Sequence, residues 1–275
     1  MRSLRSVGNV SGSDIDTLDI TDAHAVSTYF EDHPADVIVH LAALKGNLES
    51  RLRPVDFFQV NTVGVLNLLE ACRKLSIRKF VFMSSVTVHG RSDTAVDEAS
   101  PIRPLHPYGA SKAAGEALVE SYAFSYGIQA VILRPNFIVG PIPAPRPYRD
   151  NFIYDFVQAA HAKGVIHLAG DGHHEREWLH PDDVANAVRA AASRDNESCE
   201  TFLLSGNRLR MLDLVNKIAT LVGNTQIVTD PSAHWVFSLI SSNDHARRRL
   251  GWQPERDIDS IIGEIWDEYR SRLER

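Results

Sequence analysis

The spacing of short apolar segments along the chain is the feature that most constrains its fold. Three such segments, rich in Val, Ile, Leu and Phe, stand at residues 36–41, 79–84 and 129–134. Continuous apolar runs of this length are typical of strands that are buried on both faces of a parallel sheet. Because stretches long enough for helices separate them, the order predicts an α/β fold with helices on both faces of that sheet.

Helical patterns fill the intervals between the predicted strands. Asp22 is a predicted N-cap for a short helix through Glu31, which Pro34 ends. Long helices are expected over residues 54–75 and from Tyr108 to near Gly127. Further along, the pattern predicts helices at about 150–163, from Asp182, at about 211–222 and at about 258–274, and strands at 165–168 and 201–204. The Pro-rich stretch at 140–147 is the best candidate for a boundary between the sheet and a smaller lobe.

Composition argues against several classes of partner. The chain has 275 residues, 44% of them hydrophobic, and a net charge of −6 without a dense basic block, so a nucleic-acid partner is not expected. We interpret Arg247–Arg249 as a solvated helix face. No apolar run reaches the roughly 18 residues of a membrane helix. Cys72 and Cys199 form no C-x-x-C pair, which favours buried thiols and a cytoplasmic location.

Tyr108 and Lys112 are the first candidates for chemistry. Residues four apart on a helix lie on one face, and an ammonium close to a phenol favours the phenolate. Such a tyrosine can give or take a proton at neutral pH. The same spacing also occurs by chance at a solvated helix start, so the pair taken alone leaves that alternative open.

Polar residues follow three predicted strands at the point where each strand ends. They are the segments from His40 to Lys45, Ser84 and Ser85, and Pro135 with Asn136. Ligands of open parallel sheets bind at the carboxyl ends of the strands. The sequence therefore predicts a binding site along this edge of the sheet.

In their order along roughly residues 18–270, the motifs resemble those of the extended short-chain dehydrogenase/reductases. The resemblance is to the NAD-dependent epimerase/dehydratase branch, and within it to the UDP-galactose 4-epimerase-like enzymes. The segments that carry it are Leu18–Asp22, His40–Lys45, Asn61–Ala71, Phe82–Gly90 with His89 where Tyr is usual, Tyr108 with Lys112, Leu133–Asn136, Arg176–Ala185 and Leu250–Pro254.

The resemblance implies a Rossmann-like sheet, a small C-terminal substrate lobe, NAD or NADP as cofactor and a nucleotide sugar as substrate. Residues 1–140, with parts of 181–205, would form the cofactor domain, and residues 141–275 mainly the substrate lobe. The helices at 54–75 and 108–126 match those through which family members form homodimers, and packing on the sheet explains long apolar helices equally well. Hydride transfer is the implied chemistry, with Tyr108 as the acid/base.

The same resemblance assigns roles to individual residues. The catalytic residues would be Ser85, Tyr108 and Lys112. The cofactor contacts would be Asp19, Ile20, Leu41, Ala42, Ala43, Lys45, Asn61, Ser84, Tyr108 and Lys112, and the substrate contacts would be Thr87, Asn136 and Arg176. Two alternatives stay open, namely a loop-capping amide for Asn136 and a salt bridge to Glu175, Glu177 or Asp183 for Arg176. The histidines near Glu175 fit no familiar zinc spacing, so no metal is expected.

The chain departs from the family pattern in two places. The Thr-Asp-Glu of 4,6-dehydratases is replaced by Ser85-Val86-Thr87, which favours epimerisation over dehydration. The apolar strand and G-x-x-G-x-x-G turn that precede the Asp19 segment in the family are not found in residues 1–18. We therefore expect weak cofactor binding and an unpaired edge on the strand at 36–41, unless the native chain is longer or the sheet is completed by another chain or by strand rearrangement. A cofactor-deficient binding protein and a reductase of a carbonyl compound without a nucleotide remain alternatives.

Overall fold

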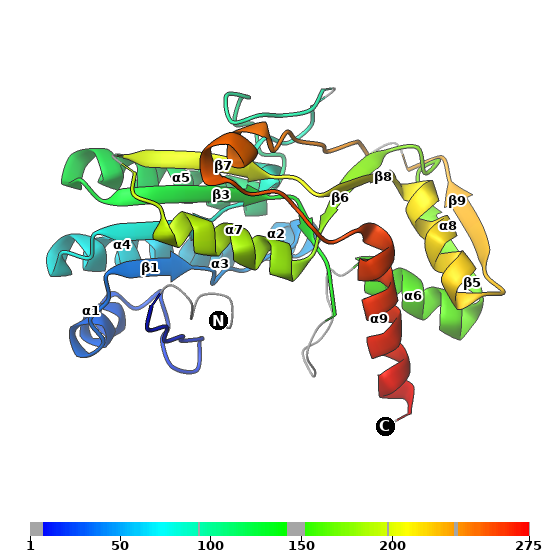
Figure 1. The fold of residues 1–275 in the computed structure, drawn as a ribbon, viewed down its shortest axis with the longest axis horizontal. Helices are drawn as coiled ribbons and strands as arrows, with labels where there is room; N and C mark the ends of the chain where they lie inside the picture. Colours follow the sequence, from blue (N-terminus) through cyan, green and yellow to red (C-terminus); the bar gives the residue numbers. More distant parts are fainter. Residues whose placement is uncertain (1–7, 93, 142–151, 197, 234–235, 275) are drawn as a thin grey trace.

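A parallel sheet forms the centre of the molecule (Figure 1). The computed structural model describes residues 8–92, 94–141, 152–196, 198–233 and 236–274. Its main sheet has the order β1-β2-β3-β7, with every neighbouring pair parallel. The strands are β1 (Val37–His40), β2 (Lys79–Met83), β3 (Gln129–Pro135) and β7 (Cys199–Leu204). The predicted fold class is confirmed, and among the described residues β1 is an edge strand.

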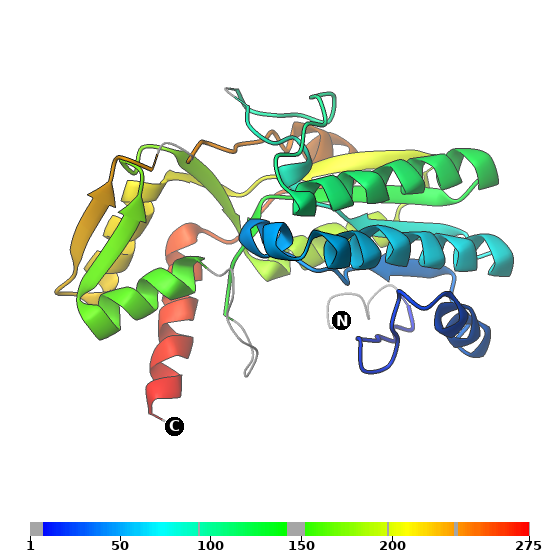
Figure 2. The ribbon, with the colours of Figure 1, turned by 180° about the vertical axis from the view of Figure 1, so that it is seen from behind.

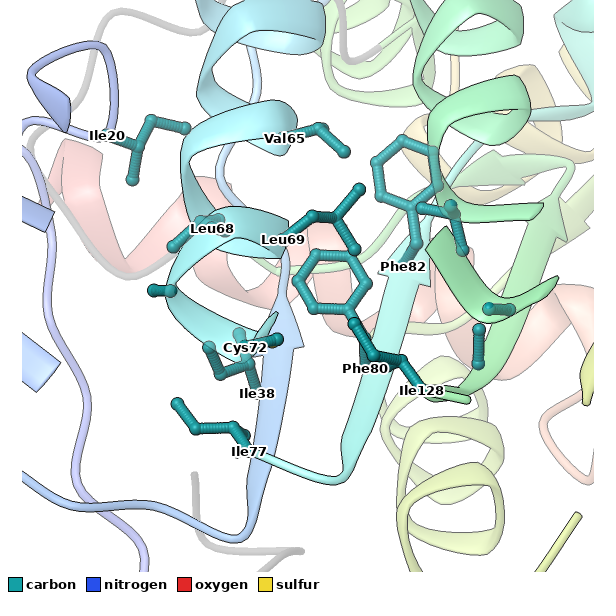
Figure 3. Close-up of a cluster of buried hydrophobic side chains, with 14 of the residues drawn as sticks. Ile20, Ile38, Val65, Leu68, Leu69, Cys72, Ile77, Phe80, Phe82 and Ile128 are labelled. Carbon is teal, nitrogen blue, oxygen red and sulfur yellow. The ribbon is translucent and has the colours of Figure 1, made fainter. Parts of the chain in front are cut away.

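Helices cover both faces of this sheet because successive strand residues point to opposite sides. On β2, Phe80 and Phe82 pack in one hydrophobic core with α4 (Gly64–Leu75) and α5 (Pro107–Tyr126), as Figure 3 shows for α4. Val81 faces the other way, into the core formed with α7 (Pro181–Ser193). Figure 2 shows α4 and α5 side by side on their common face. The continuous apolar runs in the sequence reflect this double burial.

The first helices follow the predicted pattern with one difference. Asp22 caps α1 (Ala23–Asp32) through hydrogen bonds from the backbone of His24 and Ala25. The helix expected over 54–75 is not uniform, because α3 (Pro54–Phe58) and α4 are joined by a π-helical turn at Gln59–Val63. A further helix that the sequence did not predict, α2 (Asn47–Leu52), precedes α3.

A second core lies beyond the carboxyl end of the sheet (Figure 1). It is built from α6 (Phe152–Lys163), α8 (Met211–Val222), α9 (Ile258–Leu273) and the parallel pair β5 (Val165–Ala169) and β9 (Gln226–Asp230). A small sheet with the order β4-β6-β8 also contributes, formed by Phe137–Ile138, Glu175–Leu179 and Asn207–Arg210. Most of the proposed boundary at 140–147 lies outside the described residues, so the domain limits stay a prediction.

The arginine cluster and the helix near Asp182 agree with the sequence predictions. The arginine cluster lies in a π-helical turn, Ala246–Leu250, and its three side chains are exposed as expected. The helix predicted from Asp182 begins at Pro181, and the side chain of His180 caps it. None of the described helices is both long and apolar enough to cross a membrane.

The first turn of α5 packs directly on the backbone that follows β2. A Cβ added at Gly109 would lie 2.7 Å from the carbonyl oxygen of Thr87 and 3.1 Å from Cβ of Pro104. Only glycine permits this approach, because a backbone carbonyl cannot move aside as a flexible side chain can. Gly109 therefore sets the distance between the helix that carries Tyr108 and the strand end that carries Ser85.

We predict that Gly109→Ala lowers the free energy of unfolding by about 1–3 kcal/mol, the usual cost of overpacking. Gly263→Ala is the matched control, because Gly263 lies inside α9 and an added Cβ meets nothing within 4 Å. That variant should gain about 0.5–1 kcal/mol from helix propensity. Calorimetric melting of both variants checks the pair, and equal stability changes would contradict the close-packing argument.

Candidate active site

The candidate site lies where the parallel strands end. The register pairs His40 with Phe82 and Met83 with Leu133, so β1, β2 and β3 finish at the same edge of the sheet. The polar segments predicted to meet there are therefore brought together by the strand order. This is the edge at which open parallel sheets bind ligands.

Tyr108 and Lys112 extend from α5 onto this edge. Pro107 opens the helix at a position that needs no backbone donor, which puts Tyr108 in the first turn. Tyr108 is half-buried, and its ring meets the ring of Phe57 edge to face at 6.2 Å. The pair belongs to the packed edge of the sheet, so the solvated helix start that the sequence left open is not what is observed.

Lys112 is held inside the protein next to β2. Its Nζ donates to the carbonyl oxygen of Met83 at 2.6 Å and lies 4.9 Å from the centre of the Phe82 ring. Burial lowers the pKa of Lys112 to about 7, and the charge of Glu116 opposes this shift. An ammonium with such a pKa can change its charge near neutral pH, which suits a residue that acts on a neighbouring phenol.

The end of β2 supplies two serines with different partners. Ser85 caps the short 3-10 helix Val86–Val88, and its Oγ accepts from the backbone N–H of Thr87 at 3.2 Å and from Thr87 Oγ1 at 2.9 Å. The Ser84 hydroxyl instead donates to the Glu116 carboxylate. Ser85 keeps its own proton available for a bound group, whereas the Ser84 proton is already committed.

Asn61 ties the helices to the strand end. Its side chain exchanges two hydrogen bonds of 2.9 Å with the backbone of Leu44 and donates to Ser111 Oγ at 3.0 Å. Ser111 in turn donates to the carbonyl of Tyr108 at 2.8 Å. Asn61 lies within the π-helical turn, a local distortion often found at functional sites. Through these bonds Asn61 fixes both the loop after β1 and the first turn of α5.

The remaining predicted cofactor contacts lie on two segments. Leu41, Ala42 and Lys45 are exposed just beyond β1, and Ala43 is half-buried. Asp19 is exposed and accepts from Thr21, which lowers the pKa of its carboxyl. Ile20 is buried against Gly64 at the start of α4, and its carbonyl accepts from Asn67. Small or exposed side chains after β1 leave this segment accessible to a bound molecule.

Two of the three predicted substrate contacts, Asn136 and Arg176, lie directly before β4 and within β6 of the small sheet. Asn136 follows β3, is 5% exposed, and donates to Glu177 at 2.5 Å and to Ser241 at 2.8 Å. Its carbonyl oxygen has no partner among the described residues. Burial raises the pKa of Glu177 to about 7. The amide nitrogen of Asn136 is therefore used in hydrogen bonds within the protein, whereas its oxygen can accept a hydrogen bond from a bound molecule.

Arg176 is placed between two aromatic rings. Its guanidinium carbon lies 5.7 Å from the centre of the Phe137 ring and 5.5 Å from that of Phe237. It donates to the backbone carbonyls of Glu175 and Phe237, and burial lowers its pKa to about 10. Within the described residues no ion pair joins it to a carboxylate, and Glu175 pairs with Arg208 instead. This arrangement suits an anion that arrives from outside the chain.

A buried polar group beneath the face of α5 that carries Tyr108 and Lys112 was not predicted from the sequence. Glu116 and Arg134 are 3% and 4% exposed and form an ion pair of 2.7 Å. His89 lies 3.2 Å from the guanidinium. The available signal was the spacing of Tyr108, Lys112 and Glu116, which puts all three on one helix face. No group of three or more metal-binding side chains occurs among the described residues.

His40 at the end of β1 provides a test of burial at this edge. Its ring stacks on Phe82 at 5.8 Å, its Nε2 has no partner among the described residues, and burial lowers its pKa to about 3. The unfolded chain takes up a proton at this residue as pH falls through about 6.5, whereas the folded chain does so only near 3. The contribution of His40 to stability is therefore lost as pH falls from about 6.5 toward 3.

We predict that the free energy of unfolding falls by about 2 kcal/mol less in His40→Gln than in the parent when the pH is lowered from 7 to 5. His24→Gln is the control, because His24 is exposed at the start of α1. Urea unfolding at both pH values measures the difference. An unchanged pH dependence in His40→Gln would contradict the burial of a neutral imidazole.

Comparison with known proteins identifies the family. Residues 3–204 match the model of the NAD dependent epimerase/dehydratase family, so the chain belongs to that family. It is 29% identical to UDP-glucose 4-epimerase of Streptococcus mutans, over 90% of this chain and 80% of that protein. It is 28% identical to mouse dTDP-D-glucose 4,6-dehydratase, over 99% of this chain and 78% of that protein.

Solved structures agree with this assignment. The structure of UDP-glucose 4-epimerase from Thermotoga maritima with UDP-glucose superposes with a TM-score of 0.84 at 25% identity, over 98% of this chain and 89% of that chain. The family resemblance predicted from the sequence is thus confirmed. Relatives of both the epimerase and the dehydratase kind are similar at nearly equal identity, so the comparisons do not choose between these reactions.

Proposed function

We propose that the chain is an NAD(P)-dependent epimerase or oxidoreductase that acts on a nucleotide sugar. The observation that carries the proposal is the buried Lys112 ammonium beside the Met83 carbonyl, on the same helix face as Tyr108 and at the carboxyl edge of a parallel sheet. A lysine buried this deeply lowers the stability of the fold. Its position one turn from the Tyr108 phenol on α5 gives the lysine a chemical role that explains why it is buried there.

The residues at the sheet edge fit the nicotinamide half of a dinucleotide cofactor, whereas the glycine turn that would bind its pyrophosphate is not found in residues 1–18. The segment after β1 presents exposed or small side chains over Leu41–Ala43, and Lys112 reaches the same edge from α5. Asn61 fixes the loop between them. These residues would hold the nicotinamide half, which when bound supplies a hydride acceptor and donor.

The chain's own groups would then handle the proton. Tyr108, as phenolate, takes the proton of the reacting sugar hydroxyl and later returns it. Lys112 favours the phenolate, and the Ser85 hydroxyl donates to the reacting oxygen and orients it. Arg176 holds the diphosphate of the nucleotide, since a guanidinium binds phosphate oxygens in pairs. The buried carbonyl oxygen of Asn136 and the hydroxyl of Thr87 contact the sugar.

Epimerisation fits the site better than dehydration. Elimination of water from a sugar needs an acid and a base beside the reacting carbons, and Ser85–Thr87 contain no carboxylate. The buried carboxylate on the same helix as Tyr108, Glu116, is occupied by Arg134 and Ser84. A ketone formed by hydride removal can instead be reduced again from its other face.

We predict that Tyr108→Phe abolishes turnover of a nucleotide sugar and leaves the fold intact, because the ring packing remains and only the acid/base is lost. Tyr126→Phe is the matched control, since Tyr126 is 54% exposed at the far end of the same helix. Turnover assays and circular dichroism of both variants check this. Retained turnover in Tyr108→Phe would remove the tyrosine from the mechanism.

Titration with cofactors and nucleotides separates this function from its alternatives. Calorimetry should show binding of NAD+ or NADP+, and UDP, GDP or dTDP should raise the melting temperature of the protein. Arg176→Gln should lose the nucleotide effect, while Arg208→Gln, at an exposed ion pair, should keep it. A folded sample that binds neither cofactor would favour a non-catalytic binding protein. Cofactor binding without any nucleotide effect would favour a reductase of another carbonyl compound.

A further inference from the structure

Glu116 is a buried carboxylate one helical turn beyond Lys112 on the same face of α5. It accepts from Nε and Nη2 of Arg134 at 2.9 and 2.7 Å, and the Ser84 hydroxyl donates to one of the same oxygens. Paired donors of this kind make the strongest and most directional hydrogen bonds of a carboxylate. Glu116 is therefore a fixed negative charge below the catalytic face.

The hydrogen bonds continue from Arg134 to the loop that leads into α5. Its Nη1 lies 3.2 Å from Nε2 of His89, and Nδ1 of His89 lies 3.2 Å from the carbonyl oxygen of Pro101. Because Nε2 accepts from the guanidinium, the imidazole carries its proton on Nδ1 and donates it to Pro101. Burial and the charge of Arg134 lower the pKa of His89, which keeps this ring neutral.

This network reaches the catalytic residues from two sides. Ser84 lies between Met83, whose carbonyl accepts from Lys112, and Ser85. The loop held by His89 leads through residues 101–107 to the turn that carries Tyr108. A substitution of Glu116 would therefore affect both the end of β2, where Ser84 and Ser85 lie, and the first turn of α5, which carries Tyr108.

We propose that Glu116 is a positioning residue: its carboxylate holds the end of β2 at Ser84 and supplies the negative charge that keeps Lys112 protonated inside the protein. The catalytic meaning of this inference rests on the proposed function, but the charge relation can be measured without turnover. Around Lys112, Tyr108 and Glu116 lie one turn before and one turn after it on α5, and His40 lies at the end of β1. Arg134 of β3 is paired with Glu116.

Two opposing effects act on the Lys112 ammonium. Burial disfavours its charge, and a neutral His40 beside it provides no compensation. Among the charges that face Lys112, Glu116 is the negative one that favours the protonated form. Without Glu116 the ammonium would keep the full penalty of burial, so its proton would be lost at a lower pH.

The test is the titration midpoint of Lys112, followed by NMR of the protein labelled with 13C at the lysine ε carbon. The Lys112 signal is assigned by its loss in Lys112→Met. We expect Glu116→Gln to lower the midpoint by about one pH unit, a tenfold change in proton affinity. Glu116→Asp, which keeps the charge, should stay much closer to the parent. Glu120→Gln is the matched control, because Glu120 is exposed one turn further along α5 and should leave the midpoint unchanged.

Glu116→Gln leaves Arg134 buried without its partner, so that variant can fail to fold. The double variant Glu116→Gln/Arg134→Met removes both charges and is then measured in its place, with the same expected fall in the midpoint. In an active preparation the alkaline limb of the pH profile of kcat should move to lower pH by the same amount.

An unchanged Lys112 midpoint in a folded variant without the Glu116 carboxylate would overturn this inference, whatever the turnover. A lowered midpoint in a protein without turnover on any nucleotide sugar would keep the inference and reject the proposed function. A simple structural role for Glu116 would reduce stability but leave the midpoint of Lys112 in place.

Discussion

The buried ammonium of Lys112 is the interaction on which the rest of the site depends. It donates to the carbonyl that ends β2 and lies over the Phe82 ring, so it joins helix, strand and core at one point. A lysine in such a place is unfavourable unless its surroundings compensate for the lost hydration. The Met83 carbonyl and the Glu116 carboxylate, itself held by Arg134, provide that compensation. The polar groups beneath the site are thus as necessary as the groups that face a ligand.

The two hydrophobic cores hold this arrangement in place from different sides. The core between the sheet and α4 with α5 fixes the tyrosine helix against the strand ends. The second core, around α6, α8 and α9, carries the segment with Arg176 and anchors Asn136 through Glu177. In the proposed function, a molecule bound between them would meet Tyr108 and Lys112 from one side and the Arg176 guanidinium from the other.

Much of the main sheet could be predicted from the sequence because its signals are local. Strands such as Gln129–Pro135 are continuous apolar runs, and Asp22 and Gly127 mark helix ends by their chemistry. The π-helical turn at Gln59–Val63 could not be predicted, since one extra residue in a helix leaves the apolar pattern almost unchanged. The strands Asn207–Arg210 and Gln226–Asp230 were missed because they are short and polar, and only their pairing partners make them strands.

The candidate site, too, could be predicted from the sequence only in part. Tyr108, Lys112 and Ser85 stand in recognisable motifs, but the groups that contact or face Lys112 come from β1, β2 and its own helix. The connection between Glu116 and Arg134 spans the packing of α5 on β3, which no spacing in the sequence encodes. The side chains of Asn136 and Arg176 likewise contact groups distant in sequence, Ser241 and Phe237 among them.

The central claim is that Tyr108 moves a proton while the sugar carbon exchanges a hydride. Its most direct test is the fate of deuterium at carbon 4 of UDP-glucose or UDP-galactose incubated with the protein and NAD+, followed by mass spectrometry. We expect an inverted product that retains the deuterium, because the hydride leaves and returns without contact with water. Exchange of that deuterium for solvent hydrogen, or the absence of conversion in a sample that binds both ligands, would contradict it.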